Sequence, residues 1–425
     1  MPADGPRRTK RTAPAGGGGR AGAGRTTGGS TGAGATSTVG RLERQGTWSR
    51  FDNPLLCYYG IIGLVIVMVL FGLVMVLSSS SADLLAEGDS PFRTMTSQIV
   101  FALIGLGAAG VATWVKPRWY QVWWVRWGLF GLALAAQAGT MIPAIRAAAG
   151  GNIGWIDLGF VRFQPAEILK LALCVWMPAV IKIDKARYSR PLRPYARALI
   201  GLGFSFALIM VGGDLGTAMI VVLIGAVILL AGGMRLRWWF GGLLAGGLFI
   251  ALVFISGNSN RLSRFAATYG DCSGEAAQDI CYQVNHGTAA LVSGGLTGMG
   301  LGASREKWSY LPEAHNDFIF AIIGEELGFV GAAAVIVGFM ALAWCLVTIA
   351  LRHHGSYERV VLLAVTSWIC GQAFVNIMVV LRILPVIGVP MPFVSAGGTA
   401  LISCMAAVGL ALSMARTQRD IARRG

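Results

Sequence analysis

Charged side chains are scarce in this sequence, since Asp, Glu, Lys and Arg together make up only 13% of its 425 residues. Hydrophobic residues make up 55%, and their runs are too long and too many for the core of a soluble protein. A Walker A motif is absent, so ATP-driven transport has no support. No Cys-x-x-Cys pair with His is present, and no metal site is predicted. The sequence implies no cofactor, although a divalent cation stays an open option.

The hydrophobic runs predict an all-α polytopic membrane protein with about ten transmembrane helices. A large extracytoplasmic loop, residues 258–317, separates the seventh and eighth helices. Residues 1–52 form a basic tail rich in Gly, Ala, Thr and Arg that is expected to be disordered, and residues 416–425 form a short basic tail. Between the two tails, residues 53–415 form the membrane domain. The ten spans are predicted at about 54–78, 97–115, 121–142, 164–182, 197–212, 214–233, 238–257, 318–350, 359–382 and 396–415.

The distribution of basic residues predicts the orientation of the protein in the membrane. Of the 35 Lys and Arg residues, 26 fall in the two tails, in the loops after the even-numbered spans, or in the ends of the spans next to those loops. Because Lys and Arg favour the cytoplasmic side, both termini are predicted to be cytoplasmic. The net charge of +15 is therefore mainly a topology signal, and nucleic-acid binding is not expected.

Residues 311–328, which read LPEAHNDFIFAIIGEELG, contain five ionisable side chains at the start of a hydrophobic run. Charge is expensive in a membrane, so these side chains indicate a functional site. Residues 318–350 would form a helix roughly 50 Å long against a hydrocarbon core of about 30 Å, so the segment must protrude or bend. Asp317 is therefore predicted to be a carboxylate in a water-exposed cleft at the membrane surface.

The loop of residues 258–317 combines Arg264, Arg305 and Lys307 with the glycine-rich stretch SGGLTGMGLG. Such a stretch beside basic residues can cradle a phosphate, and a flexible loop is the alternative. Residues 283–292 are amphipathic and are predicted to lie in the plane of the membrane interface.

Glu167 and Lys170 lie three residues apart after Pro165, at the start of the fourth span, and would share one helix face. Two interpretations of these residues stay open: they form an intrahelical ion pair, or they bind a charged headgroup. Two interpretations also stay open for Asp214: its side chain caps the start of the sixth helix, or it takes part directly in the chemistry.

The last outer loop, residues 382–399, has three prolines and small polar residues that include Ser395, so an irregular backbone lining a cavity is predicted. Arg382 at its start either extends its side chain to the membrane surface or contacts a ligand. Cys272 and Cys281 lie nine residues apart in the large outer loop, in an oxidising compartment, and are the disulfide candidates.

These motifs together resemble the SEDS family of shape, elongation, division and sporulation proteins, over essentially residues 50–415. The resemblance rests on the 311–328 motif and on QPAEILK, DLGTA, GLGASREKWSYLPEAH and PMPFVSAGG. The form LPEAH is more similar to the division members, of which FtsW is the type, than to the elongation members, of which RodA is the type.

The resemblance implies a peptidoglycan glycosyltransferase of the bacterial cytoplasmic membrane that polymerises lipid II outside the membrane during septal wall synthesis. Its expected partners are a class B penicillin-binding protein and other division membrane proteins. The family's essential aspartate falls on Asp317, which would be the general base of an inverting transfer from an undecaprenyl-diphosphate-linked disaccharide-peptide. The candidate substrate-binding residues are Lys170, Glu167, Arg162, Arg264, Arg305, Lys307, Glu313, His315 and Ser395.

Three motifs depart from the family pattern, at four positions. Gly154 replaces a usual arginine, for which Arg162 is the substitute we consider. Gly212 and Gly213 replace a Glu-Pro pair, and Ala396 replaces a tyrosine.

Three other functions remain open: a lipid II flippase, an elongation-type polymerase of the same family, and a structural scaffold. A flippase predicts ionisable residues spread through the depth of the membrane, whereas an enzyme predicts a cluster at one side. A scaffold predicts that Asp317 can be replaced without loss.

Overall fold

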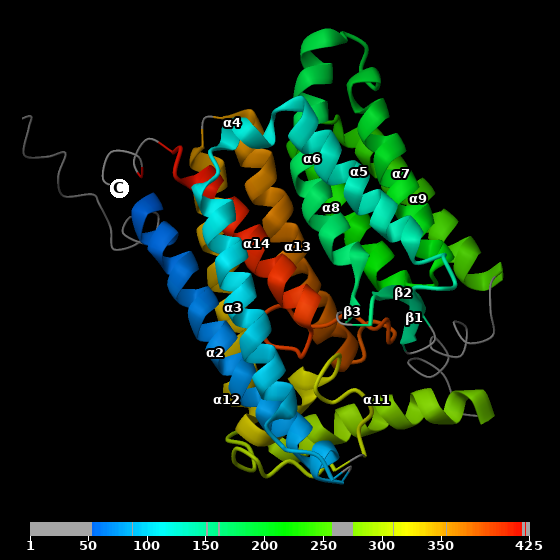
Figure 1. Cartoon of the computed structure of the whole chain (residues 1–425), viewed down its shortest axis with the longest axis vertical. Helices are drawn as coiled ribbons and strands as arrows, with labels where there is room; N and C mark the ends of the chain where they lie inside the picture. Colours follow the sequence, from blue (N-terminus) through cyan, green and yellow to red (C-terminus); the bar gives the residue numbers. More distant parts are fainter. Residues whose placement is uncertain are drawn as a thin grey trace, which may run out of the picture. The chain divides into compact units, whose positions relative to one another are not determined.

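A computed structural model describes residues 53–418 except 87, 150–151, 160–161, 257–274, 309 and 354, and it also describes residue 421. Each of the ten predicted spans coincides with a helix (Figure 1). These ten helices are α2 (Pro54–Ala86), α3 (Arg93–Trp114), α5 (Trp123–Gly139), α6 (Pro165–Arg187), α7 (Ala196–Val211), α8 (Leu215–Ala231), α9 (Leu236–Ser256), α12 (Ile319–Arg352), α13 (Ser356–Val380) and α14 (Gly398–Ala415). Three more are α4 (Pro117–Tyr120), the 3-10 helix η2 (Arg193–Tyr195) and α11 (Glu275–Gly294).

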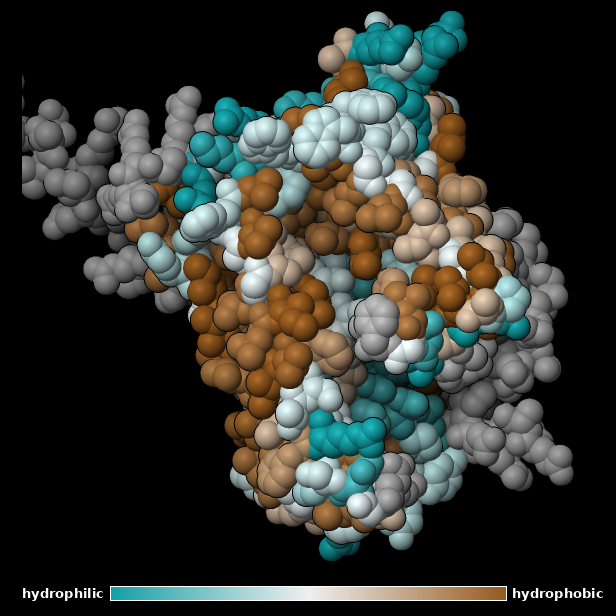
Figure 2. All heavy atoms as spheres, in the orientation of Figure 1, coloured by the Kyte–Doolittle hydropathy of each residue, from teal (hydrophilic) through white to brown (hydrophobic). Residues whose placement is uncertain are grey.

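The prediction of a helical polytopic membrane protein is confirmed. Six helical segments in the described part of the chain are long and apolar enough to cross a membrane: α2, α3, η2 with α7, α12, α13 and α14. Helices α5 and α8 have 17 residues each, which is about 26 Å of helix, so the exact count of ten stays a prediction. In the view of Figure 2, hydrophobic side chains gather across the middle of the face over α2 and α3, with hydrophilic side chains toward both ends.

Helix α6 is the centre of the core, because it packs against α5, α7, α8, α13 and α14. Its Trp176 is buried and stacks on Phe130 of α5, with ring centroids 4.1 Å apart. The absence of a side chain at Gly201 makes room for this indole, since a Cβ there would lie 2.4 Å from it. With neighbours on so many sides, even the polar residues in the first turns of α6 are buried.

A small antiparallel sheet between α5 and α6 was not anticipated from the sequence. Its strands β1 (Arg146–Ala149), β2 (Asn152–Asp157) and β3 (Arg162–Phe163) are ordered β1-β2-β3, and Ile156 pairs with both Arg146 and Phe163. The Ile153 N–H donates to the Gly212 carbonyl at 2.8 Å and so joins β2 to the turn between α7 and α8. The sheet adds a short β element to a fold that was predicted to be all-α.

Helix α11 crosses one end of the helix bundle (Figure 1), and we call this the α11 end. The stretch predicted to be amphipathic lies within this helix, which buries one residue every three or four positions, beginning with Cys281 and Val284. It packs closely on α12, since a Cβ on Gly294 would lie 1.9 Å from the Gly324 carbonyl oxygen. Helix α12 breaks at Gly328, where φ is 67° and ψ is −165°, so the predicted long segment does bend.

Candidate active site

A cavity of ≈ 330 Å³ contains Asp317. Four parts of the chain meet there: β2 with the start of α6, the start of α8, α11 with the segment before α12, and the irregular segment between α13 and α14. The lining residues are Asn152, Gly154, Trp155, Gln164, Asp214, Thr217, Gln283, Pro312, Glu313, Asn316, Asp317, Val386, Gly388, Pro390, Ala396, Gly397 and Ala400. The prediction that the last loop has an irregular backbone and lines a cavity is therefore confirmed.

Asp317 is half-buried just before α12. Its carbonyl oxygen accepts a hydrogen bond from the Asn376 side-chain amide at 2.7 Å, and the same amide donates to the Val389 carbonyl at 2.8 Å. One buried amide of α13 thus holds both walls of the cavity. The carboxylate lies beside Gly388, whose Cβ, if present, would be 3.5 Å from Asp317 Oδ2. Glycine at position 388 therefore places no side chain of its own against the carboxylate.

Ser395 fixes the backbone behind Asp317. Its hydroxyl donates to the Asn316 carbonyl at 2.7 Å and accepts from the Met391 N–H at 2.8 Å. Next to it, the Ala396 N–H donates to the His315 carbonyl at 3.0 Å. Ser395 is buried, and neither it nor His315 belongs to the cavity lining.

A second carboxylate, Asp214, lines the same cavity. It accepts from the Thr217 N–H at 2.9 Å as the N-cap of α8, and from the Gln164 side-chain amide at 2.9 Å. The capping role is confirmed, and the cap also places the carboxylate at the cavity. The absence of a side chain at Gly154 keeps the space in front of it open, since a Cβ there would be 3.8 Å from Asp214 Oδ2.

Lys170 and Glu167 form the predicted intrahelical pair, with Nζ and Oε1 2.8 Å apart. Both residues are only 1% exposed, and neither lines the cavity. The Lys170 ammonium also donates to the Gln372 side chain at 2.8 Å, and Gln372 in turn donates to the carbonyl of Pro390, a lining residue, at 2.8 Å. Lys170 therefore reaches the cavity through one amide side chain and one backbone carbonyl.

Lys307 is buried and is not among the residues that line the Asp317 cavity. Its ammonium donates to the Gly302 carbonyl at 2.6 Å and pairs with Glu326 at 3.4 Å. Glu326 also accepts from the Ser78 hydroxyl of α2 at 2.6 Å. The neighbouring Glu325 accepts from the Arg305 N–H at 2.9 Å. The two buried glutamates thus anchor the glycine-rich segment to the broken helix.

The other predicted site residues lie in different surroundings. Glu313 lines the cavity and accepts from the Asn316 side-chain amide at 2.6 Å. Exposed Arg162 has its guanidinium carbon 5.5 Å from the ring centroid of Trp155, a lining residue. Arg305 is also exposed.

Only one of the two cysteines in the predicted disulfide lies among the described residues. Cys281 of α11 is disulfide-bonded and buried. Cys272 lies outside the described residues, as does Arg264, so the pairing itself stays a prediction.

The sequence did not single out the uncharged polar lining residues Asn152, Gln164, Gln283 and Asn316. They lie on four separate segments, and a pattern along one chain does not show that such segments meet. Gln164 was within reach of sequence reasoning, because it opens the QPAEILK motif directly before α6.

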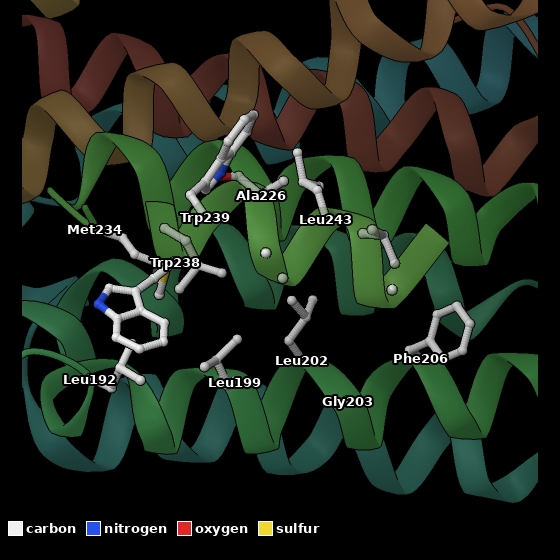
Figure 3. A pocket seen from close by; sticks show the side chains of 15 residues that line it. Leu192, Leu199, Leu202, Gly203, Phe206, Ala226, Met234, Trp238, Trp239 and Leu243 are labelled. Carbon is white, nitrogen blue, oxygen red and sulfur yellow. The ribbon is translucent and has the colours of Figure 1, made fainter. Parts of the chain in front are cut away.

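A larger, apolar cavity of ≈ 580 Å³ lies between α7, α8 and α9 (Figure 3). Its lining includes Leu199, Leu202, Phe206, Trp238 and Trp239, and it has no carboxylate, histidine or basic side chain. This lining suits a hydrocarbon chain, whereas the ionisable groups that chemistry needs are in the smaller cavity.

The family model for the cell cycle proteins FtsW, RodA and SpoVE matches residues 59–420. This chain belongs to that family. It is 31% identical over 384 residues to the probable peptidoglycan glycosyltransferase FtsW of Mycobacterium tuberculosis, which covers 89% of this chain and 71% of that protein. The FtsW of Taylorella equigenitalis, with the same description, is 34% identical over 83% of this chain and 96% of its own length. Stage V sporulation protein E of Bacillus subtilis is 32% identical over 84% of this chain and 96% of its own length.

Solved structures share the fold. A chain of a peptidoglycan synthase complex, from work on the structural coordination of polymerization and crosslinking, matches with a TM-score of 0.68 at 24% identity, covering 85% of this chain and 98% of that one. The rod shape determining protein RodA of Thermus thermophilus matches with a TM-score of 0.62 at 24% identity, and the match covers 85% of this chain and 97% of RodA.

Proposed function

We propose that this chain is a peptidoglycan glycosyltransferase of the FtsW type, which polymerises lipid II into glycan strands with Asp317 as general base. The family and the names of the relatives support the activity. The observation that carries the residue assignment is the cavity, which Asp317 lines beside Gly388.

The chemistry needs one base and one displacement. An acceptor sugar hydroxyl attacks the anomeric carbon of the donor, its proton passes to the Asp317 carboxylate, and the bond from that carbon to the lipid diphosphate breaks. A single displacement inverts the anomeric configuration, so no covalent glycosyl-enzyme intermediate forms. The Asn376 amide, which holds the Asp317 backbone, keeps the base in place without adding a charge.

The leaving diphosphate requires positive charge, yet none of the residues lining the described cavity is Lys or Arg. Arg162 reaches the rim, because its guanidinium lies over Trp155. We therefore assign diphosphate contact to Arg162, and we assign Lys170 and Lys307 to positioning the walls through their buried ion pairs. The described residues contain no cluster of three or more His, Cys, Asp and Glu side chains that could hold a metal.

The distribution of buried charge favours an enzyme over a flippase. Glu167 and Lys170 lie in the first turns of α6, Asp214 precedes α8, and Glu325 and Glu326 lie in the short part of α12 before its break. These charges gather toward the α11 end. The buried Asp184, which pairs with Arg197, lies near the other end of α6, so these charges sit at the two ends of the helix instead of following its depth. A translocation path would need them along its length.

The decisive experiment replaces Asp317 by Asn, which keeps the size and removes the base. Glycan polymerisation by the purified full chain with lipid II is expected to fall by about 10²-fold or more, since a general base contributes at least that much. Asp157→Asn is the matched control, because it makes the same substitution at an exposed carboxylate outside the cavity lining, and it is expected to keep polymerising. If Asp317→Asn polymerises as well as Asp157→Asn, the general-base assignment is wrong.

We further propose that the α11 end faces the extracytoplasmic side, that both termini are cytoplasmic, and that a class B penicillin-binding protein and other division membrane proteins are the partners. The orientation follows from the distribution of basic residues. The similarity to a chain of a peptidoglycan synthase complex supports the penicillin-binding partner. Co-purification with each class B penicillin-binding protein of the source organism, followed by polymerisation assays of the complexes, tests this. Failure of all of them to bind would remove the partner and leave the glycosyltransferase assignment standing.

A further inference from the structure

A third cavity, of ≈ 510 Å³, lies at the opposite end of the bundle, where α4 is seen in Figure 1. It is formed by the turn from α3 to α4, the first turn of α13 and the last turn of α14. Three of its side chains are basic: Lys116, Arg118 and Arg416. The remaining lining residues are Thr113, Trp114, Val115, Pro117, Gln121, Glu358, Ser413 and Thr417.

The preference of Lys and Arg for the cytoplasmic side accounts for basic residues at this end of the bundle. It does not account for their meeting in one cavity. Arg416 lies about 300 positions beyond Lys116 in the sequence, and side-chain bonds hold the two segments together. The Ser413 hydroxyl donates to the Val115 carbonyl, and the Arg416 guanidinium donates to the Thr113 carbonyl at 3.4 Å. The cavity is thus formed before any ligand arrives.

The single carboxylate in the lining, Glu358, leaves the cavity with an excess of positive charge. It lies in the first turn of α13, and a Cβ on the N-cap residue Gly355 would be 2.1 Å from its Oε2. A carboxylate in that position interacts with the unpaired N–H groups and the positive end of the helix dipole. Its charge is therefore partly balanced by its own helix, and the three basic groups face the cavity.

The surroundings are those of a lipid-facing surface. Trp114 of the lining is 85% exposed, and Trp119, Trp123 and Trp124 nearby in the sequence are exposed as well. Tryptophan is enriched where membrane meets water. The exposed apolar residues of α3, Val100, Leu103, Ile104 and Val111, recur at helical spacing and form a stripe that leads to Trp114.

We propose that this cavity binds the phosphate headgroup of an anionic phospholipid, whose acyl chains lie along the apolar stripe of α3. Basic pockets between helices at a membrane surface recognise such headgroups. The cavity provides three cations for the phosphate, and the tryptophans and the stripe provide the contact for the chains. This site is separate from the one that contains Asp317, and it does not depend on the reaction catalysed there.

The test is native mass spectrometry of the delipidated full chain in detergent, with added phosphatidylglycerol or phosphatidylcholine. We compare the wild type, the triple variant Lys116→Ala/Arg118→Ala/Arg416→Ala, and a control triple variant, Arg190→Ala/Arg235→Ala/Arg237→Ala. The control removes the same charge from exposed positions outside the cavity. The wild type and the control are expected to retain phosphatidylglycerol in preference to phosphatidylcholine, and the cavity variant to retain at least about fivefold less, because near a membrane surface each cation contributes about 1 kcal/mol.

Equal phosphatidylglycerol retention by the cavity variant and the control overturns the proposal, as does equal retention of the two lipids by the wild type. A third arm adds inorganic phosphate. If phosphate alone displaces the lipid completely at millimolar concentration, the ligand is a free phosphate and the lipid assignment is wrong. Arg118→Ala alone, at an exposed position, serves as a second variant if the triple variant does not fold.

Discussion

Gly388 illustrates how a missing side chain can shape the proposed catalytic site. Its φ is 69°, and an added methyl group would lie in van der Waals contact, at 3.5 Å, with Oδ2 of Asp317, the proposed general base. Gly388→Ala is expected to lower polymerisation by about tenfold or more, since the methyl group takes the place of the acceptor hydroxyl. The left-handed backbone adds a strain of about 1–2 kcal/mol.

Gly159→Ala separates these two effects. Gly159 has a φ of 84°, and a Cβ there would meet nothing within 4 Å. The control therefore carries the same kind of backbone strain without a group beside the carboxylate. Equal activities of the two variants in the polymerisation assay would contradict the proposal that a methyl group at position 388 interferes with Asp317.

The buried pair of Lys170 and Glu167 makes a prediction about stability. Lys170→Met leaves the Glu167 carboxylate buried without its cation, and breaking such a pair costs about 3–5 kcal/mol. The double variant Glu167→Gln/Lys170→Met removes both charges and is expected to recover much of that loss. Thermal unfolding in detergent measures both variants. A double variant as unstable as the single one would show that the charge pair is not what Lys170 contributes.

At the scale of the elements, the path of helix α12 depends on the break at Gly328. Gly328 has a backbone conformation that essentially only glycine adopts, and a Cβ there would lie 2.3 Å from the Gly298 nitrogen. Gly328→Ala is expected to lower the melting temperature and the polymerase activity together, because the strain alone is of the order of 1–3 kcal/mol. Gly338→Ala in the same helix is the control, since its Cβ meets only the flexible end of Met68. Similar melting temperatures for the two variants would count against a required break.

The same elements show how far the sequence could be interpreted. Hydrophobic runs predicted the positions of ten helices, and the excess length of residues 318–350 predicted that this segment protrudes or bends. The three-stranded sheet was missed because its strands have four, six and two residues, too few to establish an alternating pattern.

The candidate site was predictable where its residues act locally. Spacing along one helix correctly paired Glu167 with Lys170, and the charge density of residues 311–328 indicated Asp317. The surroundings of Lys307 were not predictable, because its partner Glu326 also accepts from Ser78, which comes close only through the packing of α2 on α12.

The orientation of the whole molecule can be tested with single cysteines at exposed positions. Leu301 lies in the segment packed on α12 at the α11 end and is 61% exposed, whereas Arg190 lies in the loop between α6 and η2. In intact spheroplasts, a membrane-impermeant maleimide is expected to label Leu301→Cys, and to label Arg190→Cys only after permeabilisation. The wild-type chain provides the background, because its free cysteines in the described residues are buried or half-buried. The reverse pattern would place Asp317 on the cytoplasmic side.

The break at Gly328 also has a consequence for how the chain enters the membrane during synthesis. The part of α12 after the break has roughly 24 residues, or about 36 Å of helix, which is enough to cross the hydrocarbon by itself. The nine residues before it, which include both buried glutamates, need not be threaded into lipid when the translocon releases the helix. They can dock later, once Ser304, Lys307 and Ser78 are in place to receive the charges. The end of α12 that contains the glutamates can therefore be assembled by tertiary folding, after the hydrophobic end has been inserted.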